Sequence, residues 1–202
     1  MMRRARQSIL YDGCYAHVYS RSIEERFIFK EKKDFDLLKV LLCHAKAKYP
    51  FRIFHYCFMH THFHLAVGIR SFEAFSQGMK WFKWQYTKEY NQAHKRRGTV
   101  WQGRFNSLLI EDERYLRACG LYIENNPVGA GLVKTASQWE YSSSRFYEEG
   151  RRDNLVDAYE WDGALPAIEE EKNRFFEKGA GIGSPLFQLH LKEEFLNAMP
   201  VP

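Results

Sequence analysis

The segment MHTHFHL, residues 59–65, contains the side chains best suited to bind a metal ion. On a β-strand alternate residues share a face, so His62 and His64 would point the same way and both reach one ion. Phe63 between them is apolar and would point into the core. Neutral imidazoles on a rigid strand are good metal ligands. The sequence therefore predicts a metal site at His62 and His64.

Three further histidines, His17, His55 and His60, precede this pair in the sequence. His60 and His62 have the same spacing, with Thr61 between them. We expect His60 to lie in the turn before the strand, where it could support a ligand from behind. His17 and His55 have no partner nearby in the sequence, and we interpret them as ordinary strand histidines.

A second group of candidate residues has helical spacing. Residues 114–127 read RYLRACGLYIENNP, in which Tyr115, Cys119, Tyr122 and Asn126 are spaced 4, 3 and 4 residues apart. This spacing places all four on one face of a helix. The helix should end at Asn126, because the residue before a proline disfavours helical geometry. If that face meets the histidine strand, Asn126 can offer an amide oxygen to the metal and Tyr122 a hydroxyl to a phosphate.

These residue types together suit attack on a phosphodiester. A divalent metal neutralises the non-bridging oxygens of the phosphate. A tyrosine that attacks forms a phosphotyrosine bond, which a DNA 3′-hydroxyl can later reverse. A free phenol has a pKa of about 10, so Tyr122 would need help from a metal or a base. Amide and phosphate oxygens favour Mg²⁺ or Mn²⁺ as the ion.

The surrounding sequence predicts the elements that must bring these residues together. Hydrophobic periodicity gives the order β-α-β-β-α-β-α. The first six elements match an α+β fold, a ferredoxin-like split βαβ antiparallel sheet, and the seventh is an appended C-terminal helix that carries the nucleophile. Asp34 and Ser71 are the expected N-caps of the first two helices. The expected strands are 13–20, 51–58, 62–69 and 105–110, and the expected helices are 34–50, 71–94 and 114–126.

Basic residues are concentrated in the first three quarters of the chain. The chain has a net charge of +5, with 24 Lys and Arg against 13 Asp and Glu in residues 1–147, and 4 against 10 in residues 148–177. Together with an aromatic content of 16%, this suits a polyanion whose bases can stack. We predict a catalytic domain over 1–147 and an acidic, less regular extension over 148–202.

Two short blocks are candidates for contact with nucleic acid. The basic turn HKRRG would make diffuse phosphate contacts. The WQGRF block that follows could stack its rings on bases while its guanidinium pairs with phosphate, although packing of the rings in the core explains it equally well. The candidates are Lys95, Arg96 and Arg97 in the first block, and Trp101, Arg104 and Phe105 in the second.

Composition limits the class of protein and its compartment. No apolar run reaches the roughly 18 residues of a membrane span, and the basic N-terminus lacks the apolar stretch of a secretory signal. The four cysteines are scattered without a CxxC pair, which fits reduced thiols. We expect a cytoplasmic protein without a membrane partner, associated with the nucleoid when it acts.

Several blocks within residues 11–147 are informative in their order and spacing. They are AHVYSRS, YCFMHTHFHLAV, YTKEYNQAHKRRGTVWQGRF, YLRACGLYIENNPVGAGLV and, more weakly, SQWEYSSSRFY. The chain resembles the single-tyrosine HUH transposases, most of all the REP-associated tyrosine transposase branch and the insertion-sequence transposases. The resemblance implies His62 and His64 as ligands of a divalent metal, Asn126 as the third ligand and Tyr122 as the nucleophile. It also implies transesterification on single-stranded DNA near a hairpin, leaving a 5′-phosphotyrosine and a free 3′-hydroxyl.

The chain departs from this family pattern at two places. His60 and Thr61 stand where the family usually has Pro-Asn, which could reshape the turn or add a ligand. Ser22 follows Arg21 where the family commonly has a glycine.

We therefore expect a metal-dependent single-stranded DNA transesterase. The alternative is a domesticated protein that binds structured single-stranded DNA, or RNA, without efficient turnover. The expected partner is single-stranded or hairpin DNA. The sequence leaves open whether the chain works as a monomer or as a homodimer.

Overall fold

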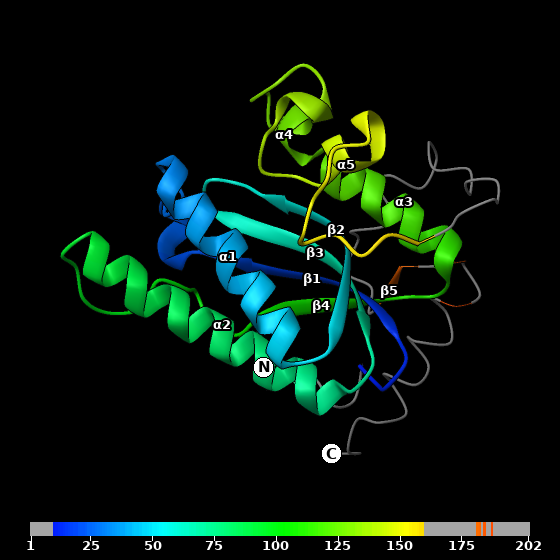
Figure 1. The fold of residues 1–202 in the computed structure, drawn as a ribbon, viewed down its shortest axis with the longest axis horizontal. Helices are drawn as coiled ribbons and strands as arrows, with labels where there is room; N and C mark the ends of the chain where they lie inside the picture. The colour runs from blue at the N-terminus through cyan, green and yellow to red at the C-terminus, as the bar shows by residue number, and fades with distance from the viewer. Residues whose placement is uncertain (1–9, 160–180, 183, 185–186, 188–202) are drawn as a thin grey trace, which may run out of the picture.

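The computed structural model describes residues 10–159, 181–182, 184 and 187 (Figure 1). Most of the predicted extension over 148–202 therefore lies outside the described residues. Four antiparallel strands form the sheet in the order β2-β3-β1-β4, and the two-residue β5 (Gly181–Ile182) adds in parallel to β4. The main strands are β1 (Tyr15–Arg21), β2 (Phe51–Phe58), β3 (His62–Ile69) and β4 (Asn106–Ile110).

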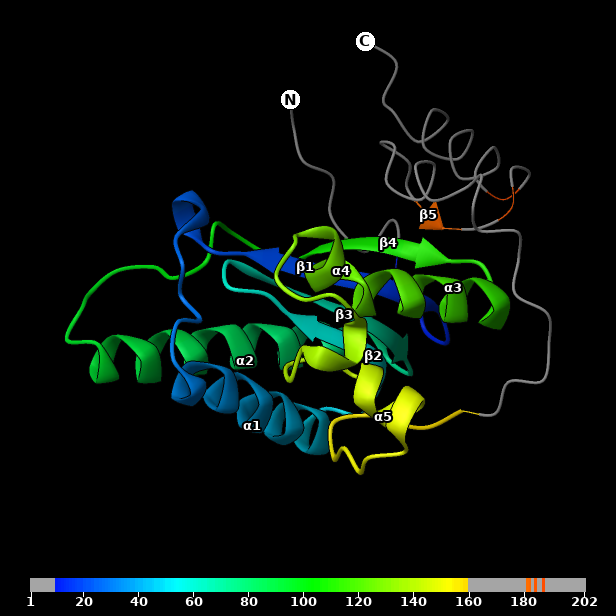
Figure 2. The same ribbon diagram turned by 90° about the horizontal axis from the view of Figure 1, so that it is seen from above.

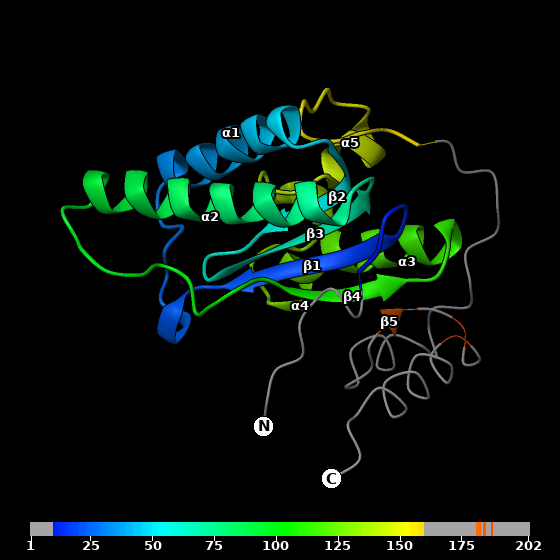
Figure 3. The same cartoon turned by 90° about the horizontal axis from the view of Figure 1, so that it is seen from below.

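Two long helices, α1 (Lys32–Lys48) and α2 (Phe72–Ala93), lie side by side on one face of the sheet (Figures 2 and 3). A third helix, α3 (Glu113–Glu124), packs on the other face. The sequence order of strands and helices and the order of strands in the sheet are those of a ferredoxin-like split βαβ unit with one helix appended. The predicted α+β fold is confirmed, including the bounds of β2 and β3.

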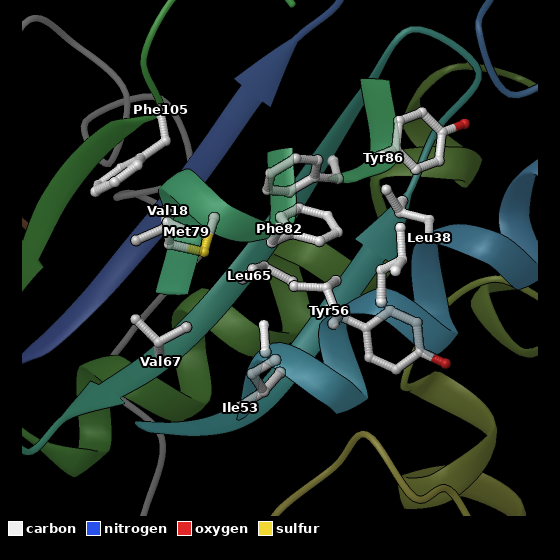
Figure 4. Packing of buried hydrophobic residues seen from close by; sticks show 14 of the residues in the cluster. Val18, Leu38, Ile53, Tyr56, Leu65, Val67, Met79, Phe82, Tyr86 and Phe105 are labelled. Carbon is white, nitrogen blue, oxygen red and sulfur yellow. The ribbon is translucent and has the colours of Figure 1, made fainter. Parts of the chain in front are cut away.

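The alternation of side chains along the strands explains the two helical layers. Val18, Leu65 and Val67 point to one face, where they pack with residues of α1 and α2 such as Met79 and Phe82 (Figure 4). This is the larger of two hydrophobic clusters. The smaller cluster lies on the opposite face and is formed with α3. Because a strand presents alternate residues to its two faces, the side chains between these core positions belong to the α3 face.

The start of α1 differs from the prediction. The helix begins at Lys32, with Glu31 as its N-cap, and Asp34 occupies the third helical position. The Asp34 carboxylate accepts hydrogen bonds from the backbone nitrogens of Lys30 and Glu31, at 3.2 and 3.1 Å, as in a capping box. It also accepts one at 2.6 Å from Nε2 of His94, which follows α2. The buried carboxylate thus ties the first turn of α1 to the end of α2.

The end of α3 also differs from the prediction. The helix stops at Glu124, two residues before the predicted end, and Asn126 begins a short helix, α4 (Asn126–Gly129). Pro127 lies in the first turn of α4, where its missing N–H is tolerated. The proline therefore starts a new helical turn, and the chain between α3 and α4 bends at Asn125.

The chain after α4 returns along the edge strand β2, to which it is hydrogen-bonded. It contains a 3-10 turn, η3 (Ala136–Gln138), and a short helix, α5 (Ser144–Glu149); an earlier 3-10 turn, η2 (Ile23–Glu25), follows β1. Beyond α5, Asp153 pairs with Lys39 and Asp157 pairs with Lys46, each at 2.8 Å. Part of the predicted extension thus packs against α1, while the division of the chain at residue 147 stays a prediction. Among the described residues, no helix is both long enough and apolar enough to cross a membrane.

Candidate active site

The predicted histidine ligands lie on the face of the sheet that α3 covers. In the pairing of β1 with β3, Tyr19 stands opposite His64 and Arg21 stands opposite His62. Residues directly opposite in an antiparallel pair share a face, so these four side chains form one surface. His17 lies two residues before Tyr19 on β1 and therefore belongs to the same face.

His62 and His64 are close enough to act on one ion. Their ring centroids are 4.9 Å apart and the rings are nearly perpendicular. Burial, reinforced by the Arg21 cation, lowers the pKa of His62 to about 4. Burial also holds the pKa of His64 well below its usual value, with further lowering from His17 and His62. Both rings are therefore neutral at neutral pH, which is the form that binds metals.

Each of these two rings is held by a hydrogen bond at its Nδ1 atom. Nδ1 of His64 lies 2.8 Å from Nε2 of the fully buried His17, and Nδ1 of His62 lies 2.8 Å from Oγ1 of Thr61. A metal-binding histidine commonly uses its second ring nitrogen in this way, because the bond fixes the orientation of the ring. In both residues Nε2 is then the atom suited to a metal, so the donor set fits a divalent ion.

The rest of the ligand set would have to come from another residue type. Across the described ranges, no three His, Cys, Asp or Glu residues are grouped so as to hold a metal ion. The rival ligand His60 faces elsewhere: its Nδ1 donates to the carbonyl of Phe29 at 2.7 Å, and its ring packs against Phe35 and Trp139. A third protein ligand therefore needs an oxygen donor such as an amide.

Tyr122 approaches the histidine face from α3. Its side chain packs against the α3 cluster and is partly buried, which raises the pKa of the phenol. Of the charges around it, Cys119 and Tyr19 raise this pKa further and the Arg21 guanidinium lowers it. Tyr19 and Arg21 are the residues paired with His64 and His62, so Tyr122 lies within electrostatic range of the same surface.

Asn126 follows Asn125, the C-cap residue of α3, and its side chain contacts the last turn of that helix. Its Nδ2 donates to the carbonyl oxygens of Tyr122 and Ile123, at 2.9 and 3.2 Å. Within the described part of the chain, no hydrogen bond uses its amide oxygen, which is the atom that could serve as a ligand. The same amide group thus binds the last carbonyls of α3, and its oxygen lies one turn beyond the tyrosine in sequence.

A buried polar network joins α3 to β2, and sequence reasoning missed it. Nδ1 of His55 donates to the Glu124 carboxylate at 2.8 Å, and Ser143 Oγ donates to the same oxygen at 2.7 Å. Nε2 of His55 lies 2.9 Å from the hydroxyl of Tyr159. Burial lowers the pKa of His55 although Glu124 opposes this, so the ring donates to the carboxylate as a neutral group.

Gly120 allows α3 to lie directly on this network. A β-carbon at this position would overlap the buried ring of His55. The register of β2 shifts between Ile53 and His55, which places His55 opposite Ala66 on the α3 side. Gly120 and Glu124 are one helical turn apart and flank Tyr122 in sequence, so the docking of α3 on His55 sets the height of Tyr122 above the sheet.

The predicted nucleic-acid contacts divide into buried and exposed residues. Trp101 and Phe105 are 5% and 4% exposed and belong to the core between the sheet and α2, where Figure 4 shows Phe105. Burial of both rings favours the packing interpretation of the WQGRF block, and contact of these rings with nucleic acid stays a prediction. Arg96 is half-buried over the Tyr90 ring, at 5.6 Å. Lys95, Arg97 and Arg104 are exposed.

Comparison with known proteins identifies the family. The family described as "Transposase IS200 like" matches residues 10–126, which is more than half of the chain and runs from before β1 to Asn126. The chain belongs to the IS200-like transposase family. The matched region contains both histidines of the site, the tyrosine helix and Asn126.

Two individual proteins are similar to this IS200-like transposase. A REP-associated tyrosine transposase of Haemophilus influenzae is 32% identical over 105 residues, which cover 47% of this chain and 60% of that protein. The match therefore spans less than two thirds of that relative. A solved REP-associated tyrosine transposase bound to a REP hairpin superimposes with a TM-score of 0.61, covering 84% of this chain and 96% of that chain at 21% identity. At this identity the similarity supports the fold.

Gly120→Ala tests whether α3 depends on contact with His55. We expect the free energy of unfolding to fall by about 1–3 kcal/mol, because an extra methyl group in a packed core forces shifts of that cost. Urea unfolding followed by circular dichroism measures the change. Gly129→Ala is the matched control, since a β-carbon there meets nothing within 4 Å. Equal stability of the two variants would contradict the close approach.

A second prediction concerns the stability of the fold at acid pH. Burial lowers the pKa of His17 to about 3, whereas a histidine in the unfolded chain takes up a proton near pH 6.5. Between these values the unfolded state binds more protons, so stability falls as the pH falls. We expect His17→Gln to remove roughly 1.4 kcal/mol per pH unit from that slope between about pH 6 and pH 4. Urea unfolding in EDTA measures both slopes; identical slopes would contradict the prediction.

Proposed function

We propose that this transposase is a metal-dependent transesterase that cleaves and rejoins single-stranded DNA through Tyr122. One observation carries the proposal: Arg21 and Tyr19, which influence the ionisation of Tyr122, are the strand partners of His62 and His64. In support of the proposal, the helix that carries the tyrosine packs on the face of the sheet where the two neutral imidazoles lie. Such a surface can receive a phosphodiester between a nucleophile and a charge-neutralising group.

His62, His64 and the amide oxygen of Asn126 would hold the ion, for which Mg²⁺ or Mn²⁺ suits the mixed nitrogen and oxygen donors. The bound ion would neutralise charge on the non-bridging phosphate oxygens. The exposed Arg21 guanidinium lies on the same face and would add positive charge where the phosphate sits. His17 would keep the His64 ring in the orientation that presents Nε2.

In the proposed reaction the Tyr122 oxygen attacks the phosphorus and loses its proton. A bond forms between this oxygen and phosphorus, and the bond from phosphorus to the 3′ oxygen of the DNA breaks. The departing 3′ oxygen takes up a proton, which leaves a 5′-phosphotyrosine and a free 3′-hydroxyl. Attack by a 3′-hydroxyl in the reverse sense rejoins DNA without an external energy source.

Hairpin-bearing DNA is the proposed substrate, and the chain would meet it at the nucleoid. The solved relative with this fold carries a REP hairpin. In this chain the exposed Lys95, Arg97 and Arg104 lie on the segment between α2 and β4, where they could contact the DNA backbone. The domain over residues 1–147 would carry this activity.

Tyr122→Phe should abolish covalent attachment to DNA, because phenylalanine has no oxygen to attack the phosphorus. The measurement is a denaturing gel of the protein incubated with labelled hairpin-bearing single-stranded DNA and Mg²⁺ or Mn²⁺. Tyr115→Phe, on the same helix, is the matched control and should retain the adduct. An adduct that survives Tyr122→Phe would refute the assignment, and no adduct under any condition would favour the binding-only alternative.

His64→Ala should abolish cleavage while DNA binding is largely kept, because the histidine acts on the phosphate through the ion. The expected loss exceeds the roughly 10- to 100-fold typical of residues that only support a ligand. The same gel measures cleavage, and fluorescence anisotropy measures binding. His44→Ala, an exposed histidine on α1, is the control. Equal loss of cleavage and binding would indicate a structural histidine instead.

A further inference from the structure

The α2 ridge, the outer surface of this helix, carries Trp84 between Lys80 and Lys88. None of these residues takes part in the proposed reaction. Lys80, Trp84 and Lys88 are spaced four residues apart and all three are exposed, so they form one line along the helix. Trp84 is 59% exposed, an unusual state for a tryptophan. Nζ of Lys88 lies 5.7 Å from the centre of its ring. Because α2 covers the face opposite α3 (Figure 3), this ridge faces away from His62 and His64.

Two hollows flank this ridge, and Lys80 and Trp84 line both of them. One has a volume of about 410 Å³ and is completed by Tyr49, Gln77 and Trp81. The other has a volume of about 580 Å³ and extends from α2 to the segment 99–105, which includes Arg104. Volumes of this size are typical of sites for small organic groups. The exposed indole thus stands between two places where a flat ring could lie.

The smaller hollow has closely packed walls. Gly78 lets α2 approach the end of α1, because a β-carbon at Gly78 would lie 2.9 Å from Cβ of Tyr49. Tyr49 is therefore wedged against α2. Nζ of Lys48 lies 5.4 Å from the centre of the Tyr49 ring and 5.9 Å from that of Trp81. Aromatic faces that are fixed before binding lose little freedom when a ligand stacks on them.

The positive charge of this surface favours an anionic ligand. The residues that line the two hollows include three cations and no Asp or Glu among the described residues. Lys48 and Lys88 add positive charge at the rim. Cations that alternate with the exposed ring of Trp84, beside the partly buried rings of Trp81 and Tyr49, match a strand of phosphates and unpaired bases. A second copy of this basic surface would repel it.

We propose that the α2 ridge binds a segment of single-stranded DNA, with bases stacked on Trp84 and Trp81 and phosphates at Lys80 and Lys88. The choice of DNA as the occupant rests on the proposed function, but the binding itself needs no cleavage. The ridge would hold unpaired DNA on the side of the protein away from Tyr122. The chain would then contact its substrate on both faces of the sheet.

Trp84→Ala tests the proposal directly. The probe is a fluorescein-labelled, unpaired oligonucleotide of about 16 nucleotides, and anisotropy in EDTA measures its affinity. We expect binding to weaken about 5- to 150-fold, the range for loss of one base–aromatic stack. Tyr11→Ala is the matched control, because Tyr11 is 60% exposed and lies outside both hollows; it should bind as the wild type does. Circular dichroism checks that both variants fold.

A positive readout completes the design. An oligonucleotide with iodouracil in place of thymine should cross-link under ultraviolet light to the peptide that contains Trp84. Unchanged affinity of Trp84→Ala, together with no cross-link to that peptide, would overturn the proposal. So would a dimer in sedimentation that Trp84→Ala converts to a monomer, since the ridge would then join two copies. The anisotropy assay contains no metal, so it does not depend on cleavage. A missing covalent adduct would therefore refute the proposed reaction without affecting the test of DNA binding at the α2 ridge.

Discussion

The contact between α3 and the His55 ring determines where the candidate nucleophile lies. Tyr122 lies on a helix and not on a strand of the sheet, so its position depends on how that helix docks on the sheet. Gly120 allows the helix backbone to rest on the ring, and Glu124 accepts a hydrogen bond from the same ring at 2.8 Å. A buried carboxylate without partners would be costly, and here His55 and Ser143 both donate to it. These contacts together favour one distance of α3 from the sheet and one rotation of α3 about its own axis.

Burial on the α3 face affects the two kinds of functional group in opposite ways. It keeps His62 and His64 neutral by lowering their pKa values, and the neutral ring is the form of histidine that can bind a metal. It raises the pKa of the Tyr122 phenol, which disfavours the phenolate. Of the described charges around the phenol, the Arg21 guanidinium is the one that lowers its pKa. Burial thus favours the neutral form of the two histidines and disfavours the anionic form of Tyr122.

The local sequence pattern predicted the four main strands, the three main helices and the shared face of His62 and His64, but not the start of α1 or the end of α3. The spacing of His62 and His64 shows their shared face because a strand alternates strictly, and the hairpin between β2 and β3 is fixed by its short turn. The roles of His17 and His55 could not be read in this way. Their partners, His64 and Glu124, are 47 and 69 residues away and meet them only through strand register and helix docking. Pattern reasoning treated both as ordinary strand residues, and for the same reason it missed Glu124.

Aromatic residues mislead sequence reasoning in a related way. Trp101 and Phe105 sit beside arginine in a basic stretch and suggest stacking on bases, yet both are buried against α2. Trp84, in the middle of an amphipathic helix, lies on the face opposite the apolar stripe, and it is exposed. What separates them is the helical period, which places Trp84 on the line of Lys80 and Lys88 and away from the stripe of Met79, Phe82 and Tyr86. The helical period determines which residues lie on the polar face of a helix, whereas a loop has no such period. In a basic protein, an aromatic residue between cations on the polar face of a helix is therefore a better candidate for contact with unpaired bases than one in a basic loop.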